Sequence, residues 1–467
     1  MRLVRSSIYV YLSVTFLFIL CSEGRTAVID ADPSNYETLR DSLQPGDTLR
    51  LAPGNYPLLY LRNINGTPAS WITVEGPETG APAIVNPDPG NPFCCNLIEI
   101  SNSSYLAVKN LTIDSGGTDG IFGINSTRTN HDILIENCTF LGQGSHQQTV
   151  GISTKGTDWN WTIRGNTIVG AGTGMYLGSS TGGSPFINGV VEGNLIVDTI
   201  GYNIEIKYQN PYSLQSGMPP GPHRTIIRNN VFIKEKSQSE WSPNQLSGAR
   251  PNLLVGGFPD TGANADDHYE IYGNFFYKNP DESLFQGSGR VYLHDNVFVG
   301  ASDTSALFQD HDHPLKVAYV YNNTVYGGNR GISVSNSAAL EAAVILGNVV
   351  FSASGISGPG QSDNVVDTMT NATNYVAQPS LVLGAMDFYP LSGELQGPPL
   401  ALSSFTNHSD YDSDFNGTSK GDFSFRGAYS GEGPNPGWLL ARERKVGGPS
   451  GSSEVVRPDR IADLKAQ

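Results

Sequence analysis

An asparagine returns at the end of one short apolar segment after another along most of this 467-residue chain. The steps between these asparagines are 27, 29, 28, 36, 44, 22, 27 and 25 residues. Each step holds short apolar runs and turns but no amphipathic helical stretch, and a period of this size marks a stacked-repeat architecture. The nine positions are Asn110, Asn137, Asn166, Asn194, Asn230, Asn274, Asn296, Asn323 and Asn348.

Each asparagine is followed by a second apolar run and, later in the repeat, by a third, such as GMYLG at 174–178. Three strands per repeat predict coils with a triangular cross-section, and parallel crossovers are right-handed in nearly all proteins. Asparagine suits the corner of a coil because it tolerates a left-handed backbone and its amide can bond to the equivalent residue one coil away. The sequence therefore predicts an all-β fold, a right-handed parallel β-helix with all nine asparagines at its corners.

The chain divides into four regions by composition. At the start, Arg2 and Arg5 precede an apolar run that is too short to span a membrane, and Ser22 and Gly24 suit signal cleavage. We therefore expect a secreted protein, with NYETLRDSL at 35–43 forming a capping helix. The expected regions are a signal peptide at 1–24, an N-terminal cap and first coils at 25–100, the β-helix with a closing segment at 101–437, and a disordered tail or linker at 438–467.

Charge and cysteine content limit the partners. A formal net charge of -16 argues against nucleic acid and anionic membranes. A monomer without a membrane span is expected, because one elongated solenoid buries a continuous core with a modest apolar fraction. Beyond the signal peptide, Cys94, Cys95 and Cys138 permit at most one intramolecular disulfide, from Cys138 to either of the other two, and buried thiols are the alternative.

Two long steps mark insertions, at 208–224 and 234–269. Insertions in adjacent coils of a solenoid stack beside one another, so we expect them to build one wall of a groove. Tyr208, Tyr212 and Trp241 lie in these insertions and could act as platforms for sugar rings. The alternative is length variation without a role.

The segment NIEIK beside the first insertion carries the strongest local signal. Strand alternation turns Asn203, Glu205 and Lys207 outward, while the isoleucines point into the core. Residues on neighbouring coils would extend this face into a polar strip for substrate; the alternative is a solvated sheet face with one Glu–Lys pair. The neighbouring residues are Lys155, Tyr176, Gln286 and Gln309.

Two acidic and histidine-containing clusters compete with that strip. FQDHDHP at 308–314 places Asp310, His311, Asp312 and His313 at the end of a strand, and ADDH at 265–268 lies in the longer insertion. Either could support hydrolysis by paired carboxylates or bind a metal ion, and solvated turns are the alternative.

The run PGDTLRLAPGNY, then NGTPASWITVEG at 65–76 and the asparagine repeat, resembles the opening of right-handed parallel β-helix proteins of the pectate-lyase superfamily. In layout it is most similar to the branch holding alginate lyases and chondroitinase B, and to bacterial right-handed β-helix repeat proteins. The resemblance covers roughly residues 28–430.

The resemblance implies action on an acidic polysaccharide by β-elimination. It implies Lys207 as the base, Glu205 and Asn203 as ligands of a calcium ion, and His223, Arg224 or Arg250 as charge stabilisers or proton donor. Because this fold hosts many functions, a non-catalytic carbohydrate-binding or cell-surface protein, a glycoside hydrolase and a uronate epimerase stay open as alternatives.

Overall fold

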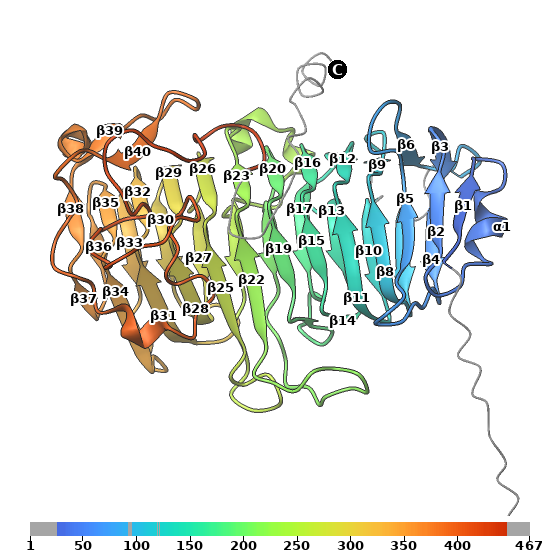
Figure 1. The fold of residues 1–467 in the computed structure, drawn as a ribbon, viewed down its shortest axis with the longest axis horizontal. Coiled ribbons are helices and arrows are strands. Elements are labelled where there is room, and N and C mark those ends of the chain that lie inside the picture. Colours follow the sequence, from blue (N-terminus) through green and yellow to red (C-terminus); the bar gives the residue numbers. More distant parts are fainter. Residues whose placement is uncertain (1–25, 92–95, 119, 121, 446–467) are drawn as a thin grey trace, which may run out of the picture.

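The computed structural model describes residues 26–91, 96–118, 120 and 122–445. Within these ranges the chain winds as a stack of coils, from α1 (Tyr36–Arg40) at one end to a loop-rich segment at the other (Figure 1). The expectations for the signal peptide, for Cys94 and Cys95, and for residues 446–467 lie outside the described residues. No helix in the described part of the chain is long and apolar enough to cross a membrane.

Three long sheets run along the stack. Sheet A comprises β1 (Val28–Ala31), β2 (Thr48–Leu51), β5 (Ile72–Glu75), β8 (Ser104–Lys109), β11 (Thr129–Glu136), β15 (Thr162–Arg164), β19 (Val190–Glu192), β22 (Arg224–Arg228), β25 (His268–Tyr272), β28 (Gly289–His294), β31 (Leu315–Tyr321), β34 (Ala342–Leu346) and β37 (Gln361–Ser362), with β14 (Thr157–Trp159) and β18 (Phe186–Ile187) alongside. Sheet B comprises β3 (Gly54–Pro57), β6 (Ala83–Asn86), β9 (Thr112–Asp114), β12 (Thr139–Leu141), β16 (Thr167–Val169), β20 (Leu195–Val197), β23 (Val231–Ile233), β26 (Phe275–Asn279), β29 (Val297–Ala301), β32 (Thr324–Tyr326), β35 (Val349–Phe351) and β38 (Val365–Asp367). Sheet C comprises β4 (Leu59–Arg62), β7 (Ile98–Ser101), β10 (Ile124–Thr127), β13 (Val150–Thr154), β17 (Thr173–Leu177), β21 (Ile204–Ile206), β24 (Leu253–Val255), β27 (Phe285–Gly287), β30 (Thr304–Phe308), β33 (Arg330–Val334) and β36 (Ile356–Ser357).

Each strand of these sheets pairs in parallel with its equivalents in the coils before and after it. The fold is a right-handed parallel β-helix, as the repeat predicts. The remaining elements are an antiparallel pair, β39 (Val376–Gln378) and β40 (Asp387–Pro390), and four short 3-10 helices: η1 (Gln238–Glu240), η2 (Pro243–Gln245), η3 (Met369–Asn374) and η4 (Leu402–Phe405).

The core consists of side chains that stack on their equivalents one coil away. On sheet B the rings of Phe232, Phe276 and Phe298 follow one another at centroid distances of 4.7 and 4.5 Å, and all three are fully buried. Because strand alternation sends every second side chain inward, neighbouring coils bury each other's apolar residues in one continuous column.

A ladder of buried asparagine amides runs along one corner. The backbone N–H and the Nδ2 of Asn194 both donate to Oδ1 of Asn230, at 3.0 and 2.9 Å, and Asn230 bonds in the same way to Asn274. Each rung thereby satisfies a buried backbone N–H that no strand pairs. The rungs are Asn166, Asn194, Asn230, Asn274, Asn296, Asn323, Asn348 and Asn364.

Asn110 and Asn137 are not rungs, which corrects the expectation for two of the nine asparagines. They are the residues before the rung position, with φ of 56° and 53°, and Leu111 and Cys138 stand at the rung position in those coils. The left-handed backbone belongs to the residue before each rung, as at Asn229 with φ of 55°. Two consecutive residues therefore share the corner: one makes the turn, and the next makes the amide bonds.

Both ends of the stack are covered. At the N-terminal end α1 lies within the predicted capping helix, and the Tyr36 hydroxyl donates to the carbonyl of Pro57 at 2.6 Å. At the other end, the closing segment packs apolar residues such as Phe388 against the outer face of sheet B, and the ring of Phe405 stacks on Tyr321 of sheet A at 4.3 Å. The hydrophobic clusters that fix this segment lie on sheets A and B, which leaves the outer face of sheet C outside them.

The last described residues are bound to the solenoid rather than detached from it. Arg442 pairs with Asp198 at 2.8 Å and with Glu235 at 3.0 Å. The Lys445 ammonium donates to the carbonyl of Gly273 at 2.7 Å and to Asn229 Oδ1 at 3.0 Å. The segment 438–445, which composition assigned to a disordered tail, is therefore part of the folded structure.

Candidate functional site

Two rows of outward side chains line sheet C. In the first of these, here named the outer row, cross-strand pairing aligns Tyr176 with Glu205, Glu205 with Leu254, and Leu254 with Gln286. The second row lies two residues further along each strand and contains Lys155, Lys207 and Gln309. The polar strip expected around NIEIK is therefore present at these positions.

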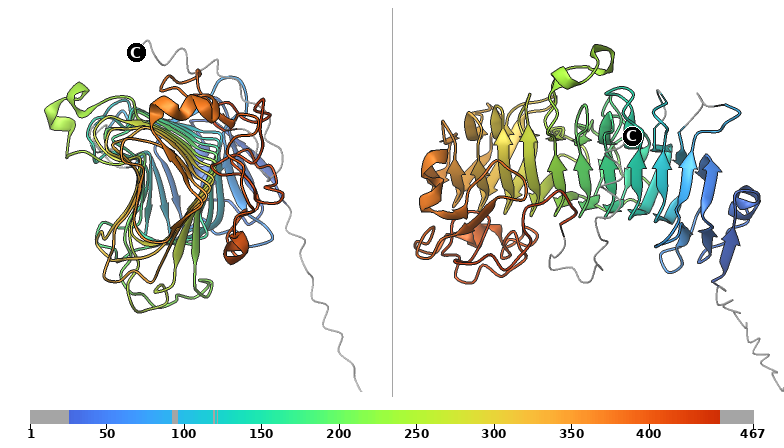
Figure 2. Two further views of the ribbon diagram at one scale, coloured as in Figure 1. Left: turned by 90° about the vertical axis from the view of Figure 1, so that its left-hand side faces the viewer. Right: turned by 90° about the horizontal axis from the view of Figure 1, so that it is seen from above.

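The insertions flank this strip on two sides and do not form one wall. Residues 208–223 stack on residues 256–267, with the N–H of Gln209 donating to the Gly257 carbonyl at 3.1 Å. Strand β24 divides the second insertion, so residues 234–252 leave at the opposite end of the sheet C strands. There the N–H of Gln147 donates to the Gln245 carbonyl at 2.8 Å. The two sets of loops project from separate corners (Figure 2).

A buried carboxylate surrounded by cations forms the centre of the strip. Lys207 Nζ lies 3.1 Å from Oε1 of Glu205, and their side chains are 14% and 6% exposed. Burial raises the pKa of Glu205, and the charges of Lys207, Lys155 and Arg250 oppose that rise. Arg250 reaches this region from the 234–252 loop, with its guanidinium 5.6 Å from the Tyr202 ring.

Lys155 is the second cation of the strip and is held against an aromatic face. Its Nζ lies 3.5 Å from the centroid of the Tyr176 ring. The pKa of Lys155 is lowered to about 8: burial is the main cause, the Glu205 charge opposes it, and the Lys207 charge adds to it. Burial also raises the pKa of Tyr176, so its hydroxyl keeps its proton near neutral pH. An amine that loses its proton near pH 8 is suited to general base catalysis.

The FQDHDHP corner belongs to the same site. Lys207 Nζ lies 3.9 Å from Oδ2 of Asp312, and the His313 ring meets the Tyr208 ring edge-on at 5.5 Å. The lysine strip and this corner, which the sequence presents as competing sites, are therefore one cluster. Strand alternation places Gln309 on the strip but does not reach Asp312 and His313, which follow the strand and approach Lys207 and Tyr208 through the course of the turn.

His223, Tyr212 and Asp267 form a separate, buried group. His223 Nδ1 lies 3.1 Å from Asp267 and 3.2 Å from the Tyr212 hydroxyl, and its Nε2 lies 2.8 Å from the Pro219 carbonyl. The His223 side chain is 3% exposed. This group anchors the 208–223 loop, and its burial denies His223 the open position that a charge stabiliser requires, whereas Tyr212 is only partly buried.

Arg224 and Asn203 also lie away from the strip, and Trp241 contacts a lysine of its own loop. Arg224 begins β22 on sheet A, where it pairs with Glu270 at 3.5 Å. Asn203 is fully buried in the turn before β21, with its Nδ2 3.1 Å from Thr199 Oγ1, so it does not share the outward face of Glu205. Trp241 lies in the 234–252 loop under the Lys236 ammonium, 4.7 Å from its ring centroid.

The predicted calcium ligands do not fit that ion. Calcium takes six to eight oxygen ligands, many of them carboxylates, whereas Glu205 is surrounded by Lys207, Lys155 and Arg250, and Asn203 is turned away from it. In the described part of the chain, no group of three His, Cys, Asp or Glu residues could hold a metal ion. Of the ADDH segment, Asp266 pairs with Arg290 at 3.3 Å and Asp267 with His223.

Comparisons with known proteins bear on the fold. No protein-family model and no curated protein sequence matches the chain. Similar solved structures include an alginate lyase from Paenibacillus sp. str. FPU-7 (16% identity, 73% of this chain and 98% of that chain, TM-score 0.45), the pectate lyase Pel9A (11%, 80% and 92%, TM-score 0.45) and the mannuronan C-5 epimerase AlgE4 A-module of Azotobacter vinelandii (13%, 72% and 91%, TM-score 0.46). The parallel β-helix rests on the stacked sheets themselves, and at these identities and TM-scores the likenesses carry no argument about what this chain does.

Proposed function

We propose that this protein binds an acidic polysaccharide on the outer face of sheet C and cleaves it by β-elimination. The carrying observation is the convergence of Lys155, Lys207 and Arg250 on the single buried carboxylate of Glu205. In a chain of formal net charge -16, three cations beside two carboxylates, Glu205 and Asp312, leave a local excess of positive charge that favours an anionic ligand.

The elimination needs a base, a neutralised uronate carboxylate and a proton donor. Lys155, with its pKa lowered to about 8, takes the proton from C5 of the sugar, and the released electron pair forms the C4–C5 double bond. The C4–O bond breaks, and the Tyr176 hydroxyl gives its proton to the leaving oxygen. Lys207 and Arg250 neutralise the carboxylate, which stabilises the charge that develops at C5.

Lys155 replaces Lys207 as the base in this proposal. Lys207 faces two carboxylates, at 3.1 and 3.9 Å, so its side-chain nitrogen is already engaged by both. Lys155 has no carboxylate at such a distance among the described residues. No step is assigned to calcium, because neutralisation of the substrate carboxylate falls to side chains of the chain itself.

Hydrolysis is the second candidate, and one observation favours it. Glu205 and Asp312 lie on either side of Lys207, and burial raises the pKa of Glu205. A carboxylic acid with a raised pKa beside a second carboxylate is the arrangement that glycoside hydrolases use. Asp312 would then be the base or nucleophile, and Glu205 the acid.

One experiment separates these outcomes. The protein is incubated with alginate, polygalacturonate and chondroitin sulfate, with and without added calcium or a chelator, while ultraviolet absorbance and reducing ends are followed together. Elimination raises both signals, hydrolysis raises reducing ends alone, and binding without either signal identifies a non-catalytic protein. No binding and no product with any acidic glycan contradicts the proposal.

We also propose that the chain is exported to the extracellular space as a monomer. Fractionation of the native host would test the export, and light scattering would test the oligomeric state.

A further inference from the structure

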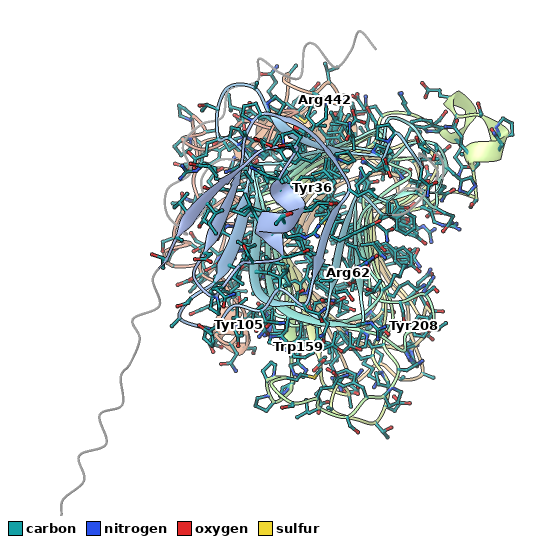
Figure 3. All side chains as sticks on the ribbon, turned by 90° about the vertical axis from the view of Figure 1, so that its right-hand side faces the viewer. Tyr36, Arg62, Tyr105, Trp159, Tyr208 and Arg442 are labelled. Atoms are coloured by element: carbon teal, nitrogen blue, oxygen red, sulfur yellow. The ribbon has the colours of Figure 1, made fainter. Side chains whose placement is uncertain are left out.

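A polar depression lies on sheet C, outside the Lys155–Lys207 site and toward the N-terminal end of the stack. It has a volume of about 790 Å³ and is lined by residues of β4, β7 and β10, together with Arg128 just beyond β10. None of these residues belongs to the Lys155–Lys207 site. In a view along the axis from the α1 end, Arg62 of this depression and Tyr208 of the site lie toward the same side of the molecule (Figure 3).

The depression carries one cation more than it carries anions. Arg62 Nε pairs with Oε1 of Glu99 at 2.9 Å, which neutralises both groups. Arg128 also lines the depression, and among the described residues its guanidinium has no hydrogen-bond or ion-pair partner. An unpaired guanidinium beside amide and hydroxyl groups, here Asn63 and Thr127, is suited to binding a carboxylate or sulfate.

The outer row connects the depression to the site without a break. Cross-strand pairing aligns Glu99 with Asn125, Asn125 with Ser153, and Ser153 with Tyr176. The side-chain oxygens of Asn125 and Ser153 are buried and have no hydrogen-bond partner within the described residues. The row is therefore polar between the depression and the site.

A smaller depression opens beside the one at Arg62 and Arg128. Its volume is about 250 Å³, Asn102 lines both, and Gln215 and Ser216 of the 208–223 loop line its other side. The loop that flanks the Lys207 site therefore reaches the smaller depression, which adjoins the one at Arg62 and Arg128 through Asn102.

We propose that the depression at Arg62 and Arg128 is a distal subsite for an acidic group of the same glycan chain that occupies the Lys155–Lys207 site. Strands β4 to β10 lie three to five inter-strand spacings from β21, which corresponds to about 14 to 24 Å. An extended glycan lying along the stack would place one sugar over roughly each strand. The protein thereby selects long acidic chains over short ones. This inference rests on the proposed function.

The test measures affinity as a function of chain length. Dissociation constants, or kcat/KM where a glycan is cleaved, are measured for galacturonate, mannuronate and guluronate oligomers from dimers to decamers. The variant is Arg128→Asn, because Arg128 has φ of 64° and asparagine tolerates that backbone. Arg50→Gln is the control: it removes an exposed cation from sheet A, on another face of the molecule.

We expect wild-type affinity to rise with length until both positions are filled. Arg128→Asn should weaken binding of the long oligomers by about threefold to tenfold, as expected for one charge-assisted contact, and leave the short oligomers unchanged. Arg62→Gln should act in the same direction, because it leaves Glu99 unpaired to repel the ligand. Arg50→Gln should match the wild type at every length.

The outcomes separate this inference from the function on which it rests. Wild-type affinity that does not depend on length, or an Arg128→Asn protein indistinguishable from the wild type with long oligomers, overturns the distal subsite and leaves the proposed function standing. An equal loss at every length also overturns it, because the arginine would then act at the Lys155–Lys207 site. Absence of binding to any oligomer by the wild type overturns both.

Discussion

Lys155, which directly follows β13, and Tyr176 of the adjacent β17 form the closest cation–ring contact of the proposed site, with the ammonium 3.5 Å from the ring centroid. The contact holds the amine in a half-buried position, and its pKa is lowered to about 8, mainly by this burial. The base and the proton donor of the proposed elimination are thus neighbours, and the charged groups around them determine the pH at which they act.

The pH dependence of cleavage should follow Lys155. Only the neutral amine can accept a proton, so kcat/KM should rise as pH increases through about 8 and level off above it. Initial rates between pH 6 and 10, at constant ionic strength, measure this rise in kcat/KM. A rate that is flat over this range would contradict the assignment of the base.

Glu205→Gln should shift the rise of kcat/KM with pH to lower pH. The Glu205 charge raises the pKa of Lys155, so its removal should lower the pKa by about one unit. Asp303→Asn is the control, because Asp303 pairs with Arg330 at 3.1 Å, away from the strip. A pH profile of kcat/KM for Glu205→Gln that matches the wild type would show that Glu205 and Lys155 do not interact.

The amide ladder should contribute measurably to stability. Asn194→Leu removes the bonds from Nδ2 to Asn230 Oδ1 and to the Ile163 carbonyl, both at 2.9 Å, and leaves the Asn166 N–H without an acceptor. We expect a loss of about 1–3 kcal/mol in the free energy of unfolding. Denaturant titration against Asn407→Leu, an exposed asparagine outside the ladder, measures it. Equal midpoints for the two variants would contradict the role of the ladder.

Asp158 should make stability depend on pH. Its side chain is fully buried, accepts a bond from Ser126 and lies 3.0 Å from Asn130 Nδ2. Burial raises the pKa of its carboxyl to about 7 from 3.8, so the folded state favours the protonated form. Its stabilising contribution is complete below the unfolded pKa and is lost as pH rises through about 7.

Asp158→Asn removes this contribution from the pH profile. Between pH 4 and 8 the wild type should lose roughly 2–4 kcal/mol relative to Asp158→Asn, and the difference between the two curves cancels the other titrating groups. Parallel curves would show that Asp158 is ionised in the folded state.

The sequence predicts the coils well because each coil repeats the same physical demand. A corner needs one residue with a left-handed backbone and one with a side-chain amide, and the spacing of asparagines reveals both. It does not reveal which residue does which. Leu111 and Cys138 occupy the rung position in two coils, where the preceding asparagine makes the left-handed turn instead. A search for repeated asparagines therefore does not distinguish the turn position from the rung position.

The site was harder to predict because its residues come from several coils. Lys155, Tyr176, Glu205 and Lys207 follow from strand alternation, which the sequence displays directly. Alternation fails at Asn203, because the strand begins one residue later and the side chain turns into the corner. It also cannot show from which corner an insertion leaves. For that reason the single wall predicted from the two insertions is wrong: strand β24 divides the second insertion between two corners.

The measurement that tests the central claim most directly is the structure of the ends produced by the wild type and by Lys155→Gln. On a cleaved acidic glycan, mass spectrometry distinguishes an unsaturated non-reducing end from the product of hydrolysis, which is heavier by one water. The account predicts unsaturated ends for the wild type and a loss of at least about a hundredfold in kcat for Lys155→Gln, with binding of the glycan retained. Saturated ends, or a Lys155→Gln protein that cleaves at the wild-type rate, would contradict it.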